Sequence, residues 1–187
     1  MDQIAQAAEP NDPSKLEGMI VIGLDPSSYK NCGWCILKIQ DGKLVLLKKF
    51  TLVLTREQED IGRLKDVYDQ TQALLTEFKP SALVVERSMG GGLQFVRNNL
   101  SETVGVVKLC CYLNNVKVYE VSPAHIKKII AGHGRAKKAH IKANIMATFG
   151  LKKAGPEHEC DAAAFAISHL VDMGWQGYEV KAPYKEP

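Results

Sequence analysis

Apolar residues along the chain fall into two kinds of pattern, and the first kind is the strand-like apolar run. Such runs predict strands at 19–25, 33–40 and 43–54. The Asp41-Gly42 pair between the last two runs predicts a two-residue hairpin turn. The first part of the sheet is therefore expected to be antiparallel.

In the second kind of pattern, segments with apolar residues at helical spacing alternate with short apolar runs that predict strands. Helices are predicted over about 56–78 and 93–114, and strands follow them at 82–86 and 116–121. Further helices are predicted at about 123–131, 137–149 and 157–174. Alternation of helix and strand is typical of parallel pairing. The sequence thus predicts an α/β fold with a mixed five-stranded sheet, three antiparallel strands and then parallel ones, flanked by helices.

Length and hydropathy favour one folded domain. We expect it over 19–175 of the 187 residues, after a disordered leader at 1–18 and before a flexible tail at 176–187. No apolar run approaches the ~20 residues of a membrane span, and the leader has neither a basic nor an apolar region typical of a secretion signal. These features predict a cytoplasmic protein without a membrane partner.

The cysteines favour the same compartment. There are five, an odd number, with Cys32 and Cys35 spaced as CxxC. No second CxxC completes a zinc site, and the pair falls inside a predicted strand rather than at a helix start. We therefore expect small buried apolar side chains in a reducing environment.

Charge is distributed unevenly along the chain. The stretch 121–156 has no Asp or Glu and carries eight basic residues, namely Lys127, Lys128, Arg135, Lys137, Lys138, Lys142, Lys152 and Lys153. Because the net charge is only +3, the rest of the chain is acidic on balance. A solvated helix face would more commonly intersperse acidic partners. The segregation favours a surface that meets phosphates.

Two carboxylates stand where predicted strands end. Asp25 closes the run at 19–25, and Glu86 closes the run at 82–86. In open α/β sheets the functional crevice lies outside the carboxyl ends of strands, so we expect both acids in one pocket. Two carboxylates brought together repel each other, and one takes up a proton unless a cation lies between them.

The start of the last helix supplies a third acid and an imidazole. His158 and Asp161 are three residues apart, so both can address one point, whereas Glu159 is near the opposite side of the helix. Glu157, four residues before Asp161, competes for the same place. The run Ala162–Ala164 lets the helix lie close against the sheet.

Acids at a helix start are also explained by the helix dipole alone, without any function. The combination of three acids with an imidazole is more specific. Oxygen ligands of this kind suit Mg²⁺ or Mn²⁺ better than structural zinc. Two such ions about 4 Å apart would support phosphodiester hydrolysis.

These pieces, in this order, resemble the RuvC-type Holliday-junction resolvases of the ribonuclease H-like superfamily, from about Met19 to Leu170. The catalytic positions of that family correspond to Asp25 in "GLDPSS", Glu86 in "VVERS", and His158 with Asp161 in "HECDAAAFAISH". Its basic positions near the cleaved phosphate correspond to Lys127 in "HIKKIIAGHG" and Lys138 in "GRAKKAHIK".

The resemblance implies a ribonuclease H-like nuclease domain over 19–175 that nicks four-way DNA junctions symmetrically as a homodimer. It implies two Mg²⁺ ions per active site, with Mn²⁺ as a substitute, held by the four catalytic positions. Lys138 would offset charge on the phosphate, and His158 would be either a metal ligand or a general base. The predicted DNA-binding residues are Lys127, Lys128, Arg135, Lys137, Lys138 and Lys142.

The sequence departs from the family pattern at two places. Ser27 stands where the family has Gly, and the segment before Gly33 is one residue longer. The loop after Glu86 in the family often carries an aromatic residue that stacks at the junction, for which Met89 and Phe95 are the candidates here.

Three other functions compete with junction cleavage. A ribonuclease H-like enzyme that acts on RNA or an RNA–DNA hybrid would use the same acids. A phosphate-binding ATPase of the actin and sugar-kinase type would need a second, similar domain. A non-catalytic junction-binding protein would have no need of clustered carboxylates near DNA phosphates.

Overall fold

A computed structural model describes residues 13–26, 31–54, 60–87, 94–153 and 155–182. In this part of the chain five strands form one sheet with the order β3-β2-β1-β4-β5. Their bounds are β1 (Ile20–Pro26), β2 (Asn31–Gln40), β3 (Lys43–Val53), β4 (Ala82–Glu86) and β5 (Lys117–Val121). β1, β2 and β3 pair in antiparallel fashion, and β4 pairs in parallel with β1 and β5. The predicted mixed sheet is confirmed.

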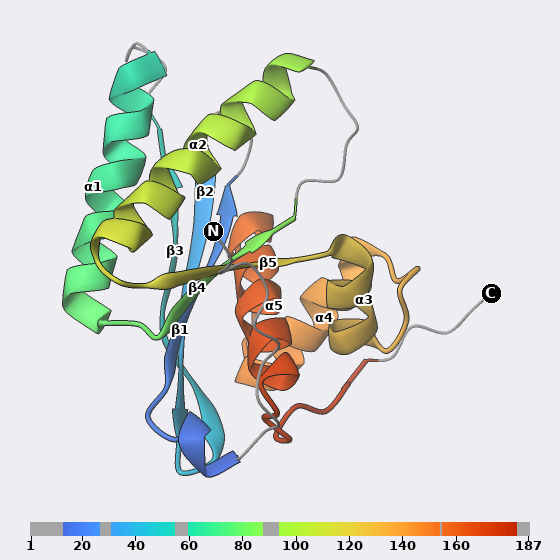
Figure 1. The fold of residues 1–187 in the computed structure, drawn as a ribbon. Helices are drawn as coiled ribbons and strands as arrows, with labels where there is room; N and C mark the ends of the chain where they lie inside the picture. The colour runs from blue at the N-terminus through green and yellow to red at the C-terminus, as the bar shows by residue number, and fades with distance from the viewer. Residues whose placement is uncertain (1–12, 27–30, 55–59, 88–93, 154, 183–187) are drawn as a thin grey trace, which may run out of the picture.

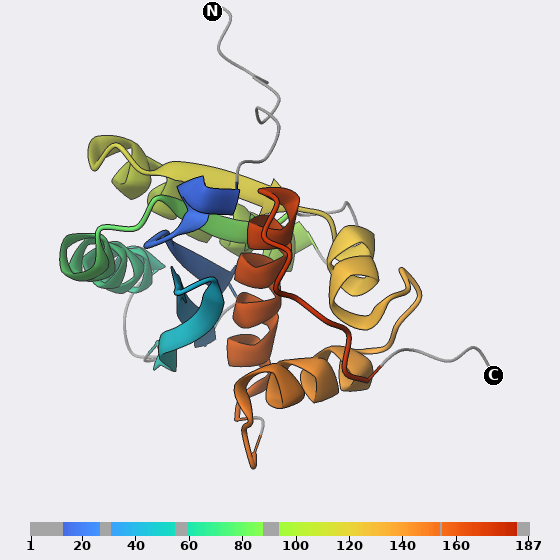
Figure 2. The ribbon, with the colours of Figure 1, turned by 90° about the horizontal axis from the view of Figure 1, so that it is seen from below.

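Helices cover both faces of the sheet (Figure 1). α1 (Asp60–Phe78) and α2 (Gln94–Leu113) lie on one face, and α5 (Glu157–Asp172) lies on the other. α3 (Pro123–Ala131) and α4 (Lys138–Phe149) pack outside α5, as Figure 2 shows from below. The apolar residues of β1 alternate between the two faces, so each face has its own core.

The hairpin turn between β2 and β3 forms hydrogen bonds with residues near both ends of the described chain. Asp41 and Gly42 both have positive φ, 52° and 70°, as the predicted two-residue turn requires. The Glu17 carboxylate accepts hydrogen bonds from the amides of Asp41 and Gly42 at 2.9 and 3.1 Å. The Trp175 indole donates to the Gly42 carbonyl at 3.0 Å.

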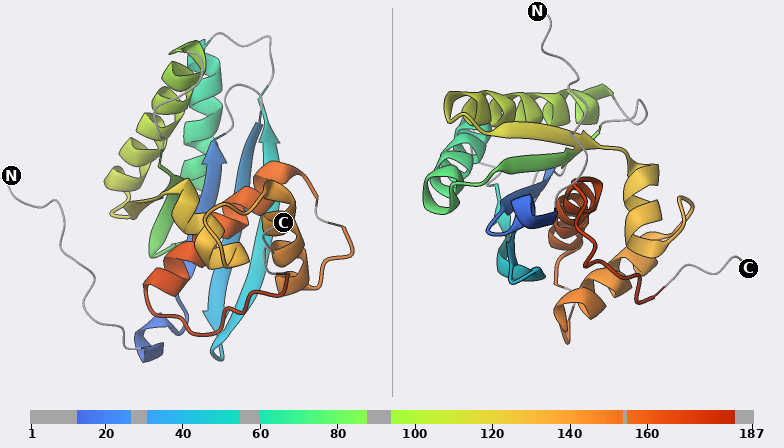
Figure 3. Two further views of the ribbon diagram at one scale, coloured as in Figure 1. Left: turned by 90° about the vertical axis from the view of Figure 1, so that its right-hand side faces the viewer. Right: turned by 60° about the horizontal axis from the view of Figure 1, so that its bottom comes forward.

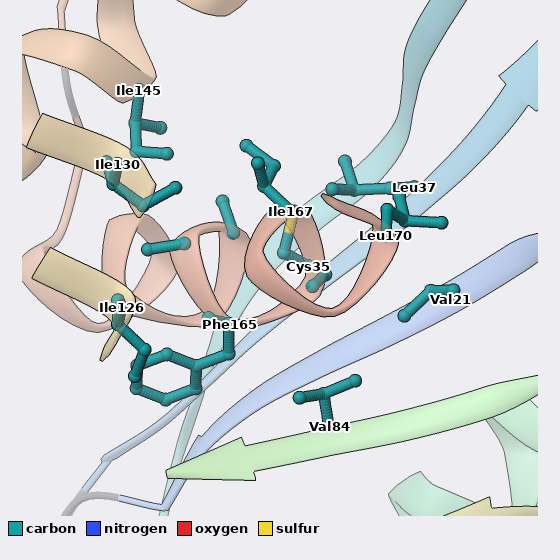
Figure 4. Packing of buried hydrophobic residues seen from close by; sticks show 14 of the residues in the cluster. Val21, Cys35, Leu37, Val84, Ile126, Ile130, Ile145, Phe165, Ile167 and Leu170 are labelled. Carbon is teal, nitrogen blue, oxygen red and sulfur yellow. The ribbon is translucent and has the colours of Figure 1, made fainter. Parts of the chain in front are cut away.

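α5 lies directly on the sheet. A Cβ built on Gly23 would come 1.8 Å from the carbonyl oxygen of Ala162, so only glycine allows this approach. The expected effect of the alanine run is confirmed. α5 then fills the space between the sheet and the outer helices: Figure 4 shows Phe165 beside Ile126 of α3, and Figure 3 shows α5 between the sheet and α3 with α4.

Packed residues extend beyond the expected domain limits of 19 and 175. Leu16, in the short 3₁₀ helix Pro13–Leu16, is 2% exposed and belongs to the core on the α5 side. Asn144 of α4 is fully buried, and its side-chain oxygen accepts hydrogen bonds from the amides of Lys181 and Ala182, each at 2.8 Å. These residues of the expected leader and tail therefore belong to the folded domain.

The five cysteines of the chain are all buried, and they form no disulfide. Burial raises the pKa of the Cys32 thiol to about 12, so the thiolate that redox or metal chemistry needs is disfavoured. This confirms the interpretation of the CxxC pair as buried apolar side chains. Among the described residues, no helix is long and apolar enough to cross a lipid bilayer.

Candidate active site

A cavity of about 360 Å³ opens at the carboxyl ends of β1 and β4. The sequence-predicted residues Asp25, Glu86, His158 and Asp161 all line it. Its remaining walls are Pro26, Leu100, Pro123, Ile126, Lys127, Lys138, Ile141 and Phe165. The expectation that the acids at two strand ends and at one helix start share a pocket is confirmed.

Asp25 and His158 are joined by a hydrogen bond. The distance between His158 Nδ1 and Asp25 Oδ2 is 2.7 Å, and because a carboxylate only accepts, Nδ1–H is the donor. Gly33, the partner of Asp25 on β2, makes the contact possible, since a Cβ there would lie 2.2 Å from the His158 carbonyl oxygen. The Nδ1 proton leaves the Nε2 lone pair for other chemistry.

Burial is the main cause that raises the pKa of the three acids. Burial raises the pKa of Asp161 to about 6, and the Asp25 charge adds to this shift. Burial also raises the pKa of Asp25, although the His158 hydrogen bond opposes the shift. Glu86 is more exposed, yet its pKa is raised by partial desolvation and by the charges of Asp25 and Asp161. The cavity therefore holds more negative charge than its own cations compensate.

Lys138, the first residue of α4, is the cation nearest these acids. Its ammonium lies 3.7 Å from Asp161 Oδ2 and donates to Glu157 Oε1. Glu157 is exposed and is not among the residues that line the cavity. The pKa of Glu157 is lowered and that of Lys138 is raised by their hydrogen bond. Of the two competing acids, Asp161 faces the cavity and Glu157 holds Lys138.

Glu159 lies on the opposite side of α5 from the cavity, as its spacing predicted. Its carboxylate is bound by Lys49 and Thr51 of β3. Sequence reasoning missed this anchoring and the role of Gly33. The signals were weak, since an isolated glycine in a strand suggests only that another backbone approaches closely.

Two of the six predicted DNA-binding residues lie at the cavity, and the other four lie on the same two helices or on the turn between them. Lys127 of α3 and Lys138 of α4 line it directly. The others lie exposed on α3, on α4 and on the turn between them, and they are Lys128, Arg135, Lys137 and Lys142. We call these six residues the basic surface. Met89 lies outside the described residues, as does the Phe95 side chain, so the predicted stacking contact stays a prediction.

The donor set suits a hard divalent cation. No three His, Cys, Asp or Glu side chains of the described residues are gathered closely enough to hold a metal ion as they stand. Asp25 is instead hydrogen-bonded to His158, and Lys138 lies near Asp161. Three acids with raised pKa nevertheless share a cavity with an imidazole, and a cation placed among them would reverse those shifts.

Strand order, helix placement and acids at the ends of β1 and β4 define a ribonuclease H-like domain with a nuclease-type site. Residues 21–169 match the family model described as crossover junction endodeoxyribonuclease RuvC, and the chain belongs to that family. Enzymes of the family are metal-dependent. The resemblance inferred from the sequence is confirmed.

Known relatives cover most of the chain. The crossover junction endodeoxyribonuclease RuvC of Carboxydothermus hydrogenoformans is 32% identical, over 83% of this chain and 98% of its own length. The Petrotoga mobilis RuvC is 29% identical, over 81% and 93%. The Thermus thermophilus RuvC, solved in complex with a Holliday junction substrate, has a TM-score of 0.76 and 26% identity, covering 84% of this chain and 97% of that chain. The yeast mitochondrial Holliday junction resolvase shares the fold alone, at 12% identity and a TM-score of 0.56.

Proposed function

We propose that this chain resolves four-way DNA junctions by paired, symmetric nicks, and that Asp25, Glu86, His158 and Asp161 form the catalytic centre. The observation that carries the proposal is their convergence in one cavity, which Lys127 and Lys138 of the basic surface also line. Acids that repel one another are tolerated here because they would share cations.

The cofactor is proposed to be two Mg²⁺ ions per site, with Mn²⁺ as a substitute. Asp25, Glu86, Asp161 and His158 would hold them, since these side chains line the cavity together. When bound, such ions supply Lewis-acid stabilisation of the phosphate and a lowered pKa for the attacking water. The positive charge of the ions would balance the Asp25 charge alongside the hydrogen bond from His158.

His158 and Lys138 have distinct proposed parts. The His158 Nε2 lone pair, set by the Nδ1 hydrogen bond to Asp25, suits either a metal ligand or a general base. Lys138 would move from the Glu157 carboxylate toward a phosphate placed in the cavity and offset its charge. Lys127 lines the same cavity and would contact the same strand of DNA.

Two symmetric nicks require two sites related by a twofold axis, so the working form is proposed to be a homodimer. The outer side of α2 offers exposed apolar area, because Leu109, Tyr112 and Leu113 are 57%, 79% and 61% exposed. Val104 and Val107 of the same helix pack inward on the sheet and are not available for a partner. A cytoplasmic location is also proposed, since the buried, reduced thiols suit a reducing compartment.

A cleavage assay with Mg²⁺ tests this proposal. Labelled four-way junctions, linear duplex and RNA–DNA hybrid are compared as substrates for the wild type and for Asp25→Asn. We expect symmetric nicks in the junction alone, and a loss of cleavage with retained binding in the variant. Asp69→Asn, the same change at an exposed carboxylate of α1, is the matched control and should cleave normally.

The two nucleic-acid rivals give different results in the same assay. Preferred cleavage of the hybrid would assign the chain to ribonuclease activity. Tight junction binding without cleavage by the wild type would make it a binding protein. Normal cleavage by Asp25→Asn would show that the site assignment is wrong.

A further inference from the structure

The Glu159 side chain is a buried carboxylate immediately next to His158. The residue is 8% exposed, and it faces β3 rather than the cavity. Glu159 Oε2 accepts a hydrogen bond from Lys49 Nζ at 2.8 Å, and Oε1 accepts one from Thr51 Oγ1 at 3.1 Å. We infer that Glu159 is a positioning residue, which ties the first turn of α5 to β3 and so holds His158 in register with Asp25. The inference rests on the proposed function for its catalytic consequence.

The first turn of α5 contacts a row of paired residues that runs across three strands of the sheet. Asp25 on β1 pairs with Gly33 on β2, and Gly33 pairs with Thr51 on β3. His158 binds Asp25 at one end of this row, and Glu159 binds Thr51 at the other end. The first turn of α5 therefore spans β2 and is attached to the strand on each side.

Two residues at the start of α5, His158 and Glu159, attach the helix to the sheet by side-chain hydrogen bonds. Pro156 occupies the N-cap position and makes no side-chain capping hydrogen bond. Helix ends fray when their amides lack partners, and His158 is only the second residue of the helix. The close approach of His158 to Gly33 is a packing contact, which attracts but has little directionality. The hydrogen bonds of Glu159 add the directional attachment.

Gly155 leaves room for this arrangement. A Cβ at that position would lie 2.7 Å from Lys49 Nζ and 3.2 Å from Glu159 Oε2. Its φ of +74° is also one that residues with a side chain rarely adopt. A buried ion pair adds little stability compared with apolar side chains of similar volume. The directional character of the Glu159 contacts, more than their stabilising effect, is therefore what serves the site.

Glu159→Gln and Thr51→Val test the inference. Glutamine keeps the size of Glu159 but removes the charge that pairs with Lys49, and valine keeps the shape of Thr51 but removes the donor. Each variant is assayed for its single-turnover rate on a pre-bound junction and for junction affinity. The His158 imidazole ¹⁵N chemical shifts are recorded without DNA or metal and are assigned by their loss in His158→Gln.

We expect single-turnover rates ~10- to 100-fold below wild type, as is typical when a residue that orients a ligand is removed. Junction affinity should be unchanged, and the His158 shifts should move because the hydrogen bond to Asp25 loosens. Ser168→Ala is the matched control: Ser168 is buried in the same helix, and its hydroxyl donates to the Ala164 carbonyl far from the first turn. It should change stability while leaving the rate and the His158 shifts as in wild type.

The inference is overturned if Glu159→Gln and Thr51→Val lower stability but keep the wild-type rate and His158 shifts, as Ser168→Ala does. Glu159 would then be a structural residue only. Absence of junction cleavage by the wild type would instead contradict the proposed function. In that case the His158 shifts still decide whether Glu159 positions His158.

Discussion

Gly33 and His158 meet backbone to backbone beside Asp25. A Cβ on Gly33 would lie 2.2 Å from the His158 carbonyl oxygen and 2.6 Å from its Cβ. Gly33→Ala should therefore push the first turn of α5 away from the sheet. We expect a loss of ~1–3 kcal/mol in the free energy of unfolding, as for other overpacked sites, together with loss of junction cleavage. Urea denaturation and the cleavage assay measure the two effects.

The same substitution at Gly105 provides the control for Gly33→Ala. Gly105 is exposed within α2, and a Cβ there would meet no atom within 4 Å. Gly105→Ala should stabilise the protein by ~0.5–1 kcal/mol because alanine is the better helix former. If Gly33→Ala were equally stabilising, the close contact of β2 with α5 would be contradicted.

Neutralising Asp161 should stabilise the metal-free protein at neutral pH. Its pKa is raised from 3.8 to about 6, so the folded state binds more protons than the unfolded state between these values. Stability contributed by the protonated form is therefore lost as pH rises through this window. The Asp161→Asn variant does not suffer this loss. We expect its free energy of unfolding at pH 8 to exceed that of wild type by about 1 kcal/mol, a value already reduced for the partial exposure of Asp161.

Urea denaturation with EDTA at pH 3.5 and pH 8 measures this effect of Asp161→Asn. The gain at pH 8 should largely disappear at pH 3.5, which lies below both pKa values, so that Asp161 is mostly protonated in both states. An equal gain at both pH values would indicate a packing effect of the amide and would contradict the electrostatic explanation.

Addition of Mg²⁺ should offset the loss of folding stability that the clustered acids cause. A ligand that binds only the folded state at 100 times its Kd adds ~2.7 kcal/mol to the free energy of unfolding. Wild type should therefore gain stability with Mg²⁺ at pH 8, and Asp25→Asn should gain less because one ligand has lost its charge. Thermal unfolding over a Mg²⁺ series measures both. Equal gains in the two proteins would mean that Asp25 is not a ligand.

The basic surface should control the salt dependence of junction binding. The double variant Lys127→Ala/Lys137→Ala should bind the junction more weakly than wild type. The magnitude of the slope of log K against log[salt] should fall by ~0.9 for each phosphate that is no longer neutralised. Affinities measured over a NaCl series give this slope. Lys65→Ala is the control, since Lys65 is exposed on α1, on the other face of the sheet, and pairs with Asp69. A reduced slope in the control would mean that the charge effect is not local.

Local patterns were sufficient for the fold and for the expectation that the four candidate catalytic residues share one cavity. The apolar runs of β1 and β4 stop at Asp25 and Glu86, and the carboxyl ends of adjacent parallel strands meet at one edge. Helical spacing then placed His158 and Asp161 on the same side of α5. These inferences need only neighbouring residues and a general rule of sheet topology.

Contacts between distant segments were beyond sequence reasoning. Lys49 and Glu159 are 110 residues apart, and their pairing depends on how far α5 is shifted along the sheet. Asn144 binds the backbone of Lys181 and Ala182, whose own side chains carry no sign of that contact. The contacts of Leu16, Lys181 and Ala182 beyond the expected limits of 19 and 175 could not be predicted for the same reason. The amino-acid composition of a polar segment does not predict which backbone groups form hydrogen bonds or that a single residue such as Leu16 is buried.

The turn at Gly42 has a consequence for how folding can be followed. The hydrogen bond between Trp175 and Gly42 joins residues 133 positions apart. We expect it to form only after the sheet, α5 and the segment that follows α5 in the chain have assembled. The chain has two tryptophans, and the other one, Trp34, is buried in the core beneath α1 and α2. In variants that keep only one of the two tryptophans, fluorescence should therefore follow the completion of one side of the sheet at a time.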